Sequence, residues 1–531
     1  MSELFPGKSK PDLDKLRGGY YTPEPIARFI SNWVAQAGPQ TLEPSAGDGA
    51  ILSHLSNVGS PTAIELVSAE AEAAKVRTGV EVQAVDFFEW FSPSRYGQFD
   101  GVAGNPPYIR FSNWAPEFRA KPFQLMTESG LKPTKLTNAW MPFVVASVLA
   151  TRDNGRIGLV LPAELLQVDY ARSLRAYLVD NCRQITLVSF SKLVFPGILQ
   201  EVVLLLATKG SGPAKFRAVE IRDANELADL TVDLEAVQAR LHETEKWTKY
   251  YLTQNEIEVM RELKNDERLS TFGDFAKVNV GVVTGRNSFF CLNSAKASQL
   301  GIEEFTIGLL SRSASIVGTR LTMSDIDAAK SKGLSNRLLA VPIGFNLDDS
   351  VPLSKYIESG EQEEVHLGYK CSIRTPWWSV PSTAIPDGFM LRQVSSRLKV
   401  ATNLADATST DTVHRVFTHP GVDMDRLAVA SLNSITLAFT EILGRSYGGG
   451  LLEMEPREAT NLPIPDPKLI PKELIAEIDS LVRQNSTERA CNLVDQEVLI
   501  GTLGISESVI EAARSAHSRL MNRRLRRGRK G

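Results

Sequence analysis

The chain has 531 residues, of which 43% are hydrophobic and 23% charged, and its 59 Lys and Arg against 62 Asp and Glu give a net charge of −3. This composition is typical of a globular protein and excludes a disordered chain, and the length indicates about two to four domains. No apolar stretch approaches the roughly 18 residues of a membrane span, and the N-terminus lacks an apolar signal region, so we expect a soluble, cytoplasmic protein. The four cysteines and six histidines are scattered, so we expect neither a disulfide framework nor a metal site.

Basic residues gather at the C-terminus, while the rest of the chain is more acidic. From position 519 onward there is no acid, and the cations are Arg519, Arg523, Arg524, Arg526, Arg527, Arg529 and Lys530. Two roles fit such a tail, a solvated end or a segment that contacts nucleic-acid phosphates.

The first 210 residues alternate between helical and strand patterns. Apolar residues recur with helical spacing from Ile26 to Ala37, where Gly38-Pro39 ends the helix. Seven short apolar runs follow with helical segments between them, at 41–43, 62–66, 80–86, 99–104, 156–162, 184–190 and 201–209. This alternation predicts a doubly wound α/β sheet that binds its ligand at the carboxyl ends of the strands. The last two runs are too close together for a helical crossover, so we expect them to be antiparallel.

The remainder of the chain has a different character. A Gly/Ser/Pro-containing stretch begins residues 211–265, whose charged pattern predicts a helical linker region. Residues 266–470 mix short strands, turns and aromatic residues and are expected to form a mixed α+β domain. Residues 471–531 are expected to form helices that end in the basic tail.

The tetrapeptide Asn105-Pro106-Pro107-Tyr108 directly follows the run at 99–104. Because two prolines fix φ and remove two amide donors, a rigid turn is its simplest role. Chemically, it holds a side-chain carbonyl oxygen next to a main-chain carbonyl, followed by an aromatic ring. Two such acceptors can take both hydrogens of one planar NH2 group and draw the nitrogen lone pair out of conjugation. An exocyclic amine then becomes a nucleophile.

A glycine-containing turn, Glu43-Pro44-Ser45-Ala46-Gly47-Asp48-Gly49, follows the first run and permits close approach of a ligand. It departs from the dinucleotide fingerprint at Leu52, which disfavours a nicotinamide or flavin cofactor. Glu65 and Asp86-Phe87 end the next two runs. Each acid alone fits a cap or a turn, but three carboxylates at neighbouring strand ends predict a pocket for a cationic or ribose-bearing ligand.

Several segments in order resemble those of S-adenosylmethionine-dependent adenine-N6 DNA methyltransferases, and their order resembles that of the TaqI-type (gamma-order) enzymes. They are GGYYTPEPIARFI (18–30), LEPSAGDGAIL (42–52), AIEL (63–66), VDFFEW (85–90), FDGVAGNPPY (99–108), GRIGLVLPAELL (155–166) and LVFPGILQEVVLLLATK (193–209). The resemblance implies a seven-stranded, Rossmann-like class I methyltransferase sheet with an antiparallel last strand over residues 1–210. Weaker similarities at 281–293, 432–434, 447–456 and 462–467 imply a target recognition domain over 266–470.

Carried over residue by residue, the resemblance implies a cofactor site and a target-base site. Cofactor contacts are expected from Thr22, Glu43, Ser45, Gly47, Gly49, Glu65, Asp86, Phe87 and Asn105. Asn105 and Pro106 would accept the amino hydrogens of an adenine flipped out of double-stranded DNA, with Pro107 shaping the turn. Tyr108 and Phe195 would stack on the base, although a core position under the last hairpin is the alternative for Phe195.

DNA contacts are expected in two places. The loop between Ile109 and Leu136 interleaves cations with aromatic residues, which fits a DNA-binding wall or an amphipathic cover over the sheet. Thr284-Gly285-Arg286-Asn287 is expected to be a turn that presents side chains suited to guanine and adenine edges. The candidate contacts are Arg110, Arg286, Asn287, Arg374 and Trp377, with Trp378, Arg392, Arg397, Lys399 and His414 in the same basic and aromatic stretch. Surface solvation or core packing is the alternative for each.

Other functions share this chemistry. Cytosine-N4 DNA methylation uses the same acceptors, and so does methylation of a glutamine amide in release factors, although those enzymes lack so large a second region. A DNA-binding or defence component without catalysis is disfavoured by the intact acidic and tetrapeptide residues. Only 17 residues precede Gly18, so we do not expect a fused nuclease. The expectation is a monomeric enzyme of a restriction-modification or related defence system in a bacterial or archaeal cell, where a separate cognate restriction endonuclease is an open possibility.

Overall fold

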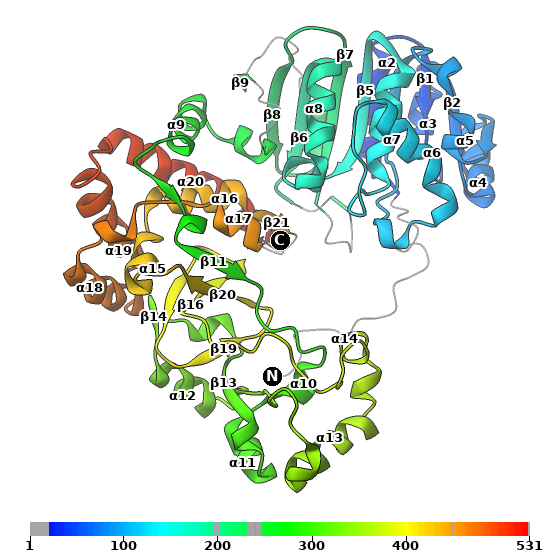
Figure 1. The fold of residues 1–531 in the computed structure, drawn as a ribbon. Helices are drawn as coiled ribbons and strands as arrows, with labels where there is room; N and C mark the ends of the chain where they lie inside the picture. Colours follow the sequence, from blue (N-terminus) through cyan, green and yellow to red (C-terminus); the bar gives the residue numbers. More distant parts are fainter. Residues whose placement is uncertain are drawn as a thin grey trace. The chain divides into compact units, whose positions relative to one another are not determined.

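The computed structural model describes residues 21–192, 194–195, 201–230, 239–240, 246–447 and 450–528. The chain divides into two compact units (Figure 1). The first is formed mainly by Met1–Gln254, and the second by Asn255–Ser446 and Leu451–Leu525.

The first unit is built on a nine-stranded sheet of order β3-β2-β1-β4-β5-β7-β6-β8-β9. Its strands are β1 (Gln40–Glu43), β2 (Ser60–Glu65), β3 (Val82–Ala84), β4 (Phe99–Gly104), β5 (Thr151–Pro162), β6 (Cys182–Phe190), β7 (Val202–Lys209), β8 (Lys215–Ile221) and β9 (Ala239–Arg240). Strands β1 to β5 pair in parallel, whereas β7 is antiparallel to both β5 and β6. The strand order reverses at β1, which is where ligand crevices open in doubly wound sheets.

The sheet is larger than the seven strands predicted. Residues Lys215–Ile221, inside the region expected to be a helical linker, form β8, which pairs in parallel with β6 and carries β9 on its other edge. Burial alternates over its first residues, with Phe216 and Ala218 buried between the more exposed Lys215, Arg217 and Val219, which is the period of a half-buried strand rather than a helix. Helical structure in the expected linker is found at α9 (Gln254–Lys264), whereas residues 231–238 and 241–245 lie outside the described part of the chain.

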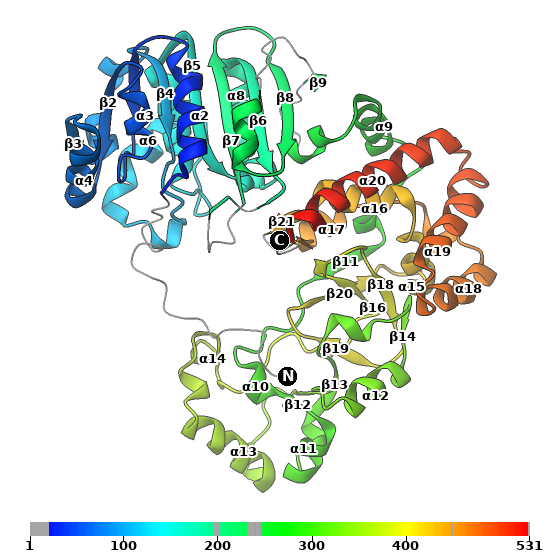
Figure 2. The ribbon, with the colours of Figure 1, turned by 180° about the vertical axis from the view of Figure 1, so that it is seen from behind.

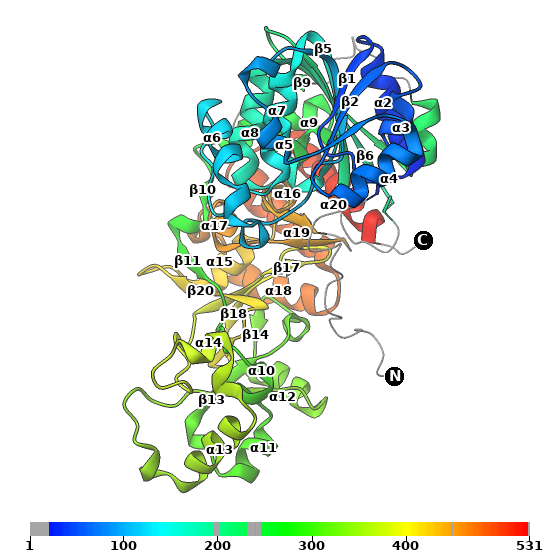
Figure 3. The same cartoon turned by 90° about the vertical axis from the view of Figure 1, so that its right-hand side faces the viewer.

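Helices cover both faces of this sheet. On one face lie α2 (Glu24–Ala35), α3 (Leu52–Leu55) and α4 (Ser68–Thr78), as Figure 2 shows. On the other lie α6 (Ala120–Glu128), α7 (Trp140–Ala150) and α8 (Arg172–Asn181), and Figure 3 shows the sheet between the two layers.

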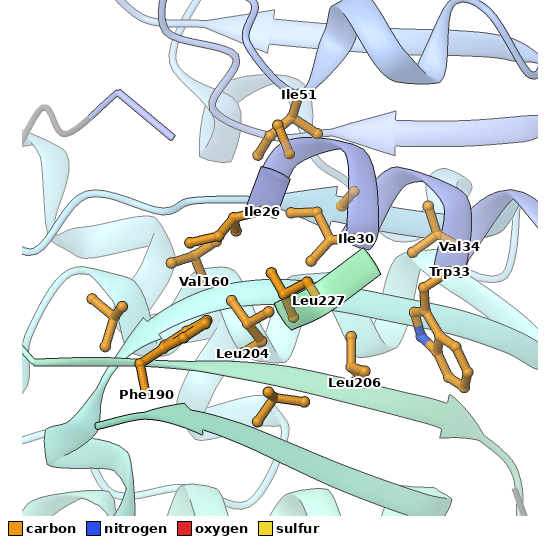
Figure 4. Close-up of a cluster of buried hydrophobic side chains, with 14 of the residues drawn as sticks. Ile26, Ile30, Trp33, Val34, Ile51, Val160, Phe190, Leu204, Leu206 and Leu227 are labelled. Carbon is orange, nitrogen blue, oxygen red and sulfur yellow. The ribbon is translucent and has the colours of Figure 1, made fainter. Parts of the chain in front are cut away.

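Helix α2 is the centre of the core on its face. It has apolar residues at helical spacing, and Ile26, Ile30 and Val34 are fully buried against strand residues such as Val160 and Leu204 (Figure 4). Burial of each such side chain contributes about 1.5–3 kcal/mol. The close approach requires glycine on the sheet, because a Cβ at Gly101 of β4 would lie 2.8 Å from the Val34 Cβ.

The second unit combines small sheets with helices. A five-stranded sheet consists of β11 (Ala276–Asn279), β20 (Val413–Thr418), β16 (Gly388–Leu391), β18 (Val400–Asn403) and β14 (Arg320–Leu321), in that order. A four-stranded sheet consists of β12 (Cys291–Leu292), β15 (Arg337–Leu339), β13 (Thr306–Leu310) and β19 (Ala407–Ser409). An antiparallel pair joins β10 (Ser270–Thr271) to β23 (Pro463–Ile464). A three-stranded sheet consists of β17 (Gln393–Val394), β22 (Leu451–Glu453) and β21 (Arg445–Tyr447), in that order. The mixture of short strands and helices matches the α+β character expected for 266–470.

The helices of the second unit lie before, between and after these strands. They are α10 (Asn287–Phe290), α11 (Ser294–Leu300), α12 (Met323–Ser331), α13 (Val351–Gln362), α14 (Tyr369–Ser372), α15 (Met424–Ala430), α16 (Ser434–Leu443), α17 (Pro456–Thr460), α18 (Lys472–Arg483), α19 (Thr487–Val494) and α20 (Glu507–Gly528). Among the described residues no single helix is long and apolar enough to cross a membrane, and α15 with α16 would reach that length only as a pair bent by 77°.

Ion pairs attach the C-terminal helices to the rest of the second unit. Arg483 of α18 contacts Asp325 of α12 at 2.9 Å and Asp479 at 2.8 Å. Asp479 also accepts the backbone N–H of Thr319 at 2.7 Å, next to β14. These bonds fix α18 against the five-stranded sheet.

The basic C-terminal segment is a helix with paired arginines, not a free end. Arg519 contacts Glu256 of α9 at 3.1 Å, and Arg524 contacts Glu441 of α16 at 2.5 Å with both side chains 3% exposed. Neither of the two roles considered for the tail, a solvated end or contact with nucleic-acid phosphates, fits these two arginines, because their guanidinium groups are already paired with carboxylates. Arg529 and Lys530 lie outside the described residues.

Replacing Arg524 with Met leaves the Glu441 carboxylate buried without its cation. Removal of one partner of a buried pair costs about 3–5 kcal/mol, so we expect a clear fall in the thermal midpoint measured by scanning calorimetry. Arg526→Met is the control on the same helix, because Arg526 is exposed, and exposed substitutions change stability by about 0.5 kcal/mol or less. Equal midpoints for the two variants would contradict the structural role of the pair.

Candidate active site

The turn after β1 is shaped by two glycines. Gly47 and Gly49 have φ of +52° and +80°, in the left-handed region that favours glycine. A Cβ at Gly49 would lie 3.0 Å from the Ala74 Cα of α4, so a side chain there would displace that helix. The Ala46 N–H donates to the Ile64 carbonyl at 2.9 Å, which attaches the turn to the end of β2.

Glu65, at the end of β2, closes the turn from the other side. Its two carboxylate oxygens accept the backbone N–H groups of Gly47 at 2.8 Å and Val67 at 2.9 Å. The carboxylate is half-buried and fixed, and each oxygen keeps acceptor capacity for a ligand hydroxyl.

Glu43 is the buried acid of the site. Its side chain is 1% exposed, and among the described residues its Oε2 atom has no hydrogen-bond partner. Burial raises the pKa of Glu43 well above its ordinary value of 4.5, and the nearby carboxylates of Glu65 and Asp48 raise it further, against a hydrogen bond from the Leu52 backbone. A buried oxygen without a partner, next to other acids, can accept a hydrogen bond from a ligand donor, and a positive charge there would offset the repulsion.

Asp86 follows β3 and caps the short helix α5 (Phe87–Trp90). Its Oδ1 accepts the backbone N–H groups of Phe88 at 2.6 Å and Glu89 at 3.3 Å, and burial raises its pKa in spite of these bonds. The Phe87 ring is 4% exposed and stacks on Phe91 and Phe143, each with ring centroids 5.3 Å apart. Phe87 is thus a core aromatic in this structure, and its ring does not form the open face expected beside a ligand.

The tetrapeptide at the end of β4 meets both the N-terminal segment and the glycine turn. The Asn105 Nδ2 donates to the Thr22 Oγ1 at 3.2 Å, and the Ser45 hydroxyl donates to the Asn105 carbonyl at 3.3 Å. The Tyr108 hydroxyl lies 2.9 Å from the Asn105 Oδ1 and 3.0 Å from the Val160 carbonyl. Because the Nδ2 atom donates to Thr22, the Asn105 Oδ1 points toward Tyr108. The single hydroxyl hydrogen of Tyr108 therefore has two acceptors within reach, the Asn105 Oδ1 and the Val160 carbonyl. Pro106 is buried and Pro107 half-buried beside them.

Phe195 lies in the hydrophobic core rather than at an open surface. Its side chain is 4% exposed and belongs to the cluster that includes Ile26 and Val188. The alternative of a core position holds in this structure, and the flanking residues 193 and 196–200 lie outside the described part of the chain.

The long loop after Ile109 is covered by its own aromatic contacts. Phe123 of α6 packs on Phe111 and Trp114 with ring centroids 6.1 and 5.7 Å apart, and the Arg119 guanidinium lies 4.2 Å above the Phe111 ring. These contacts favour the amphipathic cover over a continuous DNA-binding wall. Arg110 is exposed at the start of the loop.

The turn Thr284–Asn287 in the second unit presents two exposed side chains. Arg286 and Asn287 are exposed, and Gly285 has φ of +88°. Arg374 donates to the carbonyl oxygens of Thr284 at 2.8 Å and Val283 at 2.6 Å, which holds the turn from behind. Arg374 thus stabilises this turn. The sequence did not predict the contact, because 90 residues separate Arg374 from Thr284.

Several other residues of the basic and aromatic stretch are occupied by contacts within the protein. Trp377 donates to Glu361 at 3.1 Å and packs on Phe289. Arg392 contacts Glu453 at 2.7 Å. His414 is fully buried, and burial lowers its pKa. The expectation that these groups face a nucleic acid is not supported by their contacts.

Comparison with known proteins identifies relatives along most of the chain. Residues 53–195 match the family described as Eco57I restriction-modification methylase, and residues 244–499 match the C-terminal domain of Type II methyltransferase M.Eco57I. Type II methyltransferase M.AccI of Acinetobacter calcoaceticus is 26% identical over 498 residues, which is 88% of each chain. M.XamI of Xanthomonas campestris pv. amaranthicola is 22% identical over 470 residues, 84% of this chain and 85% of that one.

The fold is also shared with a solved structure. The Type IIL restriction-modification enzyme MmeI, solved in complex with DNA, aligns with a TM-score of 0.58 and 10% identity over 94% of this chain and 75% of that one. Together, the family matches and the relatives support a type II restriction-modification methyltransferase, which is a DNA methyltransferase.

Glu43→Gln tests the cost of the buried carboxylate. Because the pKa of Glu43 is raised on folding, its favourable contribution to stability is complete below about pH 4.5 and is lost as the pH rises through the pKa of the folded state. Glutamine does not titrate, so we expect the thermal midpoint of the variant to gain on the wild type as the pH increases. Glu72→Gln, an exposed change on α4, is the control. A difference between Glu43→Gln and wild type that does not change with pH would contradict the assignment.

Proposed function

We propose that the chain transfers a methyl group from S-adenosylmethionine to the N6 amino group of an adenine flipped out of double-stranded DNA, at a specific sequence. The observation that carries this proposal is the oriented Asn105 amide, held by Thr22 at the end of β4 beside the glycine turn. We further propose that the enzyme acts as a monomer in a restriction-modification system, with a separate endonuclease that cuts the unmethylated site.

The acidic strand ends fit S-adenosylmethionine as cofactor. Its cationic groups match the unpartnered Glu43 Oε2 in a buried acidic turn. Its ribose hydroxyls match the fixed carboxylate of Glu65, and its adenine would lie near Asp86. Gly47 and Gly49 keep the turn free of side chains at this point, and Thr22 and Ser45 join it to Asn105. When bound, the cofactor supplies an electrophilic methyl group.

The tetrapeptide prepares the amine. The Asn105 Oδ1 and the Pro106 carbonyl would accept its two hydrogens, which localises the lone pair on nitrogen. The Tyr108 hydroxyl can release the Asn105 Oδ1 by donating to the Val160 carbonyl, 3.0 Å away, without losing a hydrogen bond. No general base is needed, because methylation makes the departing proton acidic.

Stacking offsets the cost of base flipping. Flipping costs a few kcal/mol, and stacking on one aromatic ring returns about 1–3 kcal/mol. Tyr108 is half-buried and packs against the core cluster of α2, so its ring is held in place before the base arrives. We assign the stacking to Tyr108 and leave Phe195 in the core where the structure has it.

Asn105→Ala removes one of the two acceptors. We expect methyl transfer to fall by about 100-fold or more, in the range found when a single transition-state hydrogen bond is lost, while calorimetric binding of S-adenosylmethionine persists. Asn113→Ala, outside the strand ends, is the matched control. Turnover by Asn105→Ala close to that of the wild type would disprove the role of the amide.

The target base is tested by sequencing. The protein is expressed in a host without adenine methylation, and the DNA of that host is sequenced by a method that detects modified bases. We expect N6-methyladenine at one sequence motif. N4-methylcytosine would show the same acceptors serving the other exocyclic amine, whereas unmodified DNA with methylated protein would favour a glutamine amide as substrate.

Sequence readout is assigned to the turn held by Arg374. Arg286 and Asn287 are exposed and of the types that bond guanine and adenine edges. Arg286→Ala should therefore cost about 1–3 kcal/mol of discrimination between the cognate site and unrelated DNA. Lys332→Ala, an exposed cation of the same unit, controls for charge alone. Equal specificity of both variants in competition binding would exclude Arg286 from readout.

A further inference from the structure

A cavity lined by both polar and apolar residues in the second unit has no part in the proposed reaction. Its volume is about 390 Å³, and it is bounded by the segment between β17 and β18, by α15 and by the junction of α18 with α19. The polar residues that line it include Thr319, Ser396, Arg397, Lys399, Ser431 and Thr487. This size falls within the range of small-ligand pockets, roughly 300–1,000 Å³.

A second, more open hollow continues from the first. The two share Ser396, Arg397 and Thr487, and the hollow adds Arg489 and Ser486. Arg397 therefore lines both the cavity and the hollow, and the guanidinium group of Arg489 lines the hollow alone.

The walls of the cavity are fixed by buried interactions. Asp479 accepts the backbone N–H of Thr319 at 2.7 Å and is held by Arg483 at 2.8 Å. On the opposite side, Arg524 donates to the Ser395 carbonyl at 2.8 Å. The lining segments are thus held by charged contacts on two sides.

The charge of this site is unbalanced. Among the described residues, Arg397 and Arg489 have no hydrogen bond or ion pair, whereas Arg320, Arg483 and Arg524 each contact a carboxylate at 3 Å or less. Lys399 donates to the Ile316 carbonyl at 2.9 Å. Of the described residues that line the first cavity none is a carboxylate, and Glu488 is an acid at the open hollow.

Other titratable groups near Arg397 do not supply a counter-charge. Cys491 and His517 interact electrostatically with Arg397. Burial raises the pKa of Cys491 to about 12 and lowers that of His517 to about 4, so both are neutral near pH 7. A half-buried guanidinium without an anion is costly, and a bound anion would remove that cost.

We propose that this cavity binds a phosphate group, with Arg397 as its principal ligand. Arg489, Lys399 and the hydroxyl groups of Ser396 and Thr487 complete the set of donors. Guanidinium groups and hydroxyls are the usual partners of phosphate oxygens, and arginine can bond two of them at once. The backbone N–H groups at the start of α19, where Ser486 makes no side-chain cap, add further donors.

Two sources can supply this phosphate, a free phosphate ester or the backbone of DNA. The first goes beyond the proposed function, because it makes the second unit a receptor for a small metabolite. The second rests on the proposed function and deepens it, because it adds a backbone contact to the readout by Arg286.

The test uses the full-length protein, with inorganic phosphate and ribose 5-phosphate as probes. Inorganic phosphate carries neither ribose nor adenine, and the carboxylates of the cofactor site repel the phosphate of both probes, so binding at that site does not confuse the result. Binding is measured by titration calorimetry at constant ionic strength for wild type, Arg397→Gln, Arg489→Gln and the control Lys277→Gln, an exposed cation on β11. Thermal midpoints show that each variant is folded.

If the ligand is a free phosphate ester, we expect the probes to bind the wild type and Lys277→Gln, and to bind Arg397→Gln with an affinity at least tenfold weaker. If the ligand is a phosphate of the DNA backbone, we expect neither probe to bind. Arg397→Gln should then bind DNA more weakly, and the slope of log binding constant against log salt concentration should fall by about 0.9. Absence of both effects in a folded Arg397→Gln variant would overturn the proposal. None of these measurements requires methyl transfer, so failure of the proposed reaction would be seen separately.

Discussion

The close approach of the Glu43 carboxylate to those of Glu65 and Asp48, at the ends of β1 and β2, is the constraint around which the site of the first unit is organised. Glu43 is buried and lacks a partner on one oxygen, Glu65 is tied by two backbone N–H groups, and Asp86 caps α5. Like charges repel, and burial makes the repulsion stronger. The packed sheet and the glycine turn hold the acids in place at the expense of stability, which is typical of sites shaped for a ligand rather than for the empty protein.

The sequence was sufficient where a pattern is local. The strand ends, the glycine turn and the tetrapeptide follow apolar runs directly, and parallel strands bring their carboxyl ends to one edge. The structure accordingly joins Thr22, Ser45, Asn105 and Tyr108 through hydrogen bonds. The structure adds the orientation of the Asn105 amide, since no sequence pattern indicates whether its nitrogen or its oxygen contacts Thr22.

The sequence was insufficient where distant residues decide the outcome. Phe87 and Phe195 are aromatic residues next to the site, but their partners in the core come from other elements. Arg374 and Arg524 read as cations available for DNA, yet a turn and a buried acid from remote parts of the chain hold them. Charge counting fails for the same reason. A net charge near zero does not distinguish arginines paired inside the protein from those that face solvent, and only the latter can attract an anion.

The contact between α2 and the sheet has a consequence for the site itself. Thr22 immediately precedes Pro23, the cap residue of α2, so its position is set by how deeply the helix settles on β4. That depth depends on the missing side chain at Gly101, far from any reacting group. A methyl group added at Gly101 would push on Val34 in the last turn of α2, and a shift of this helix would move Thr22, which holds the Asn105 amide. The orientation of the Asn105 amide therefore depends on helix–sheet packing as well as on the tetrapeptide, and a buried glycine at the far end of α2 contributes to it.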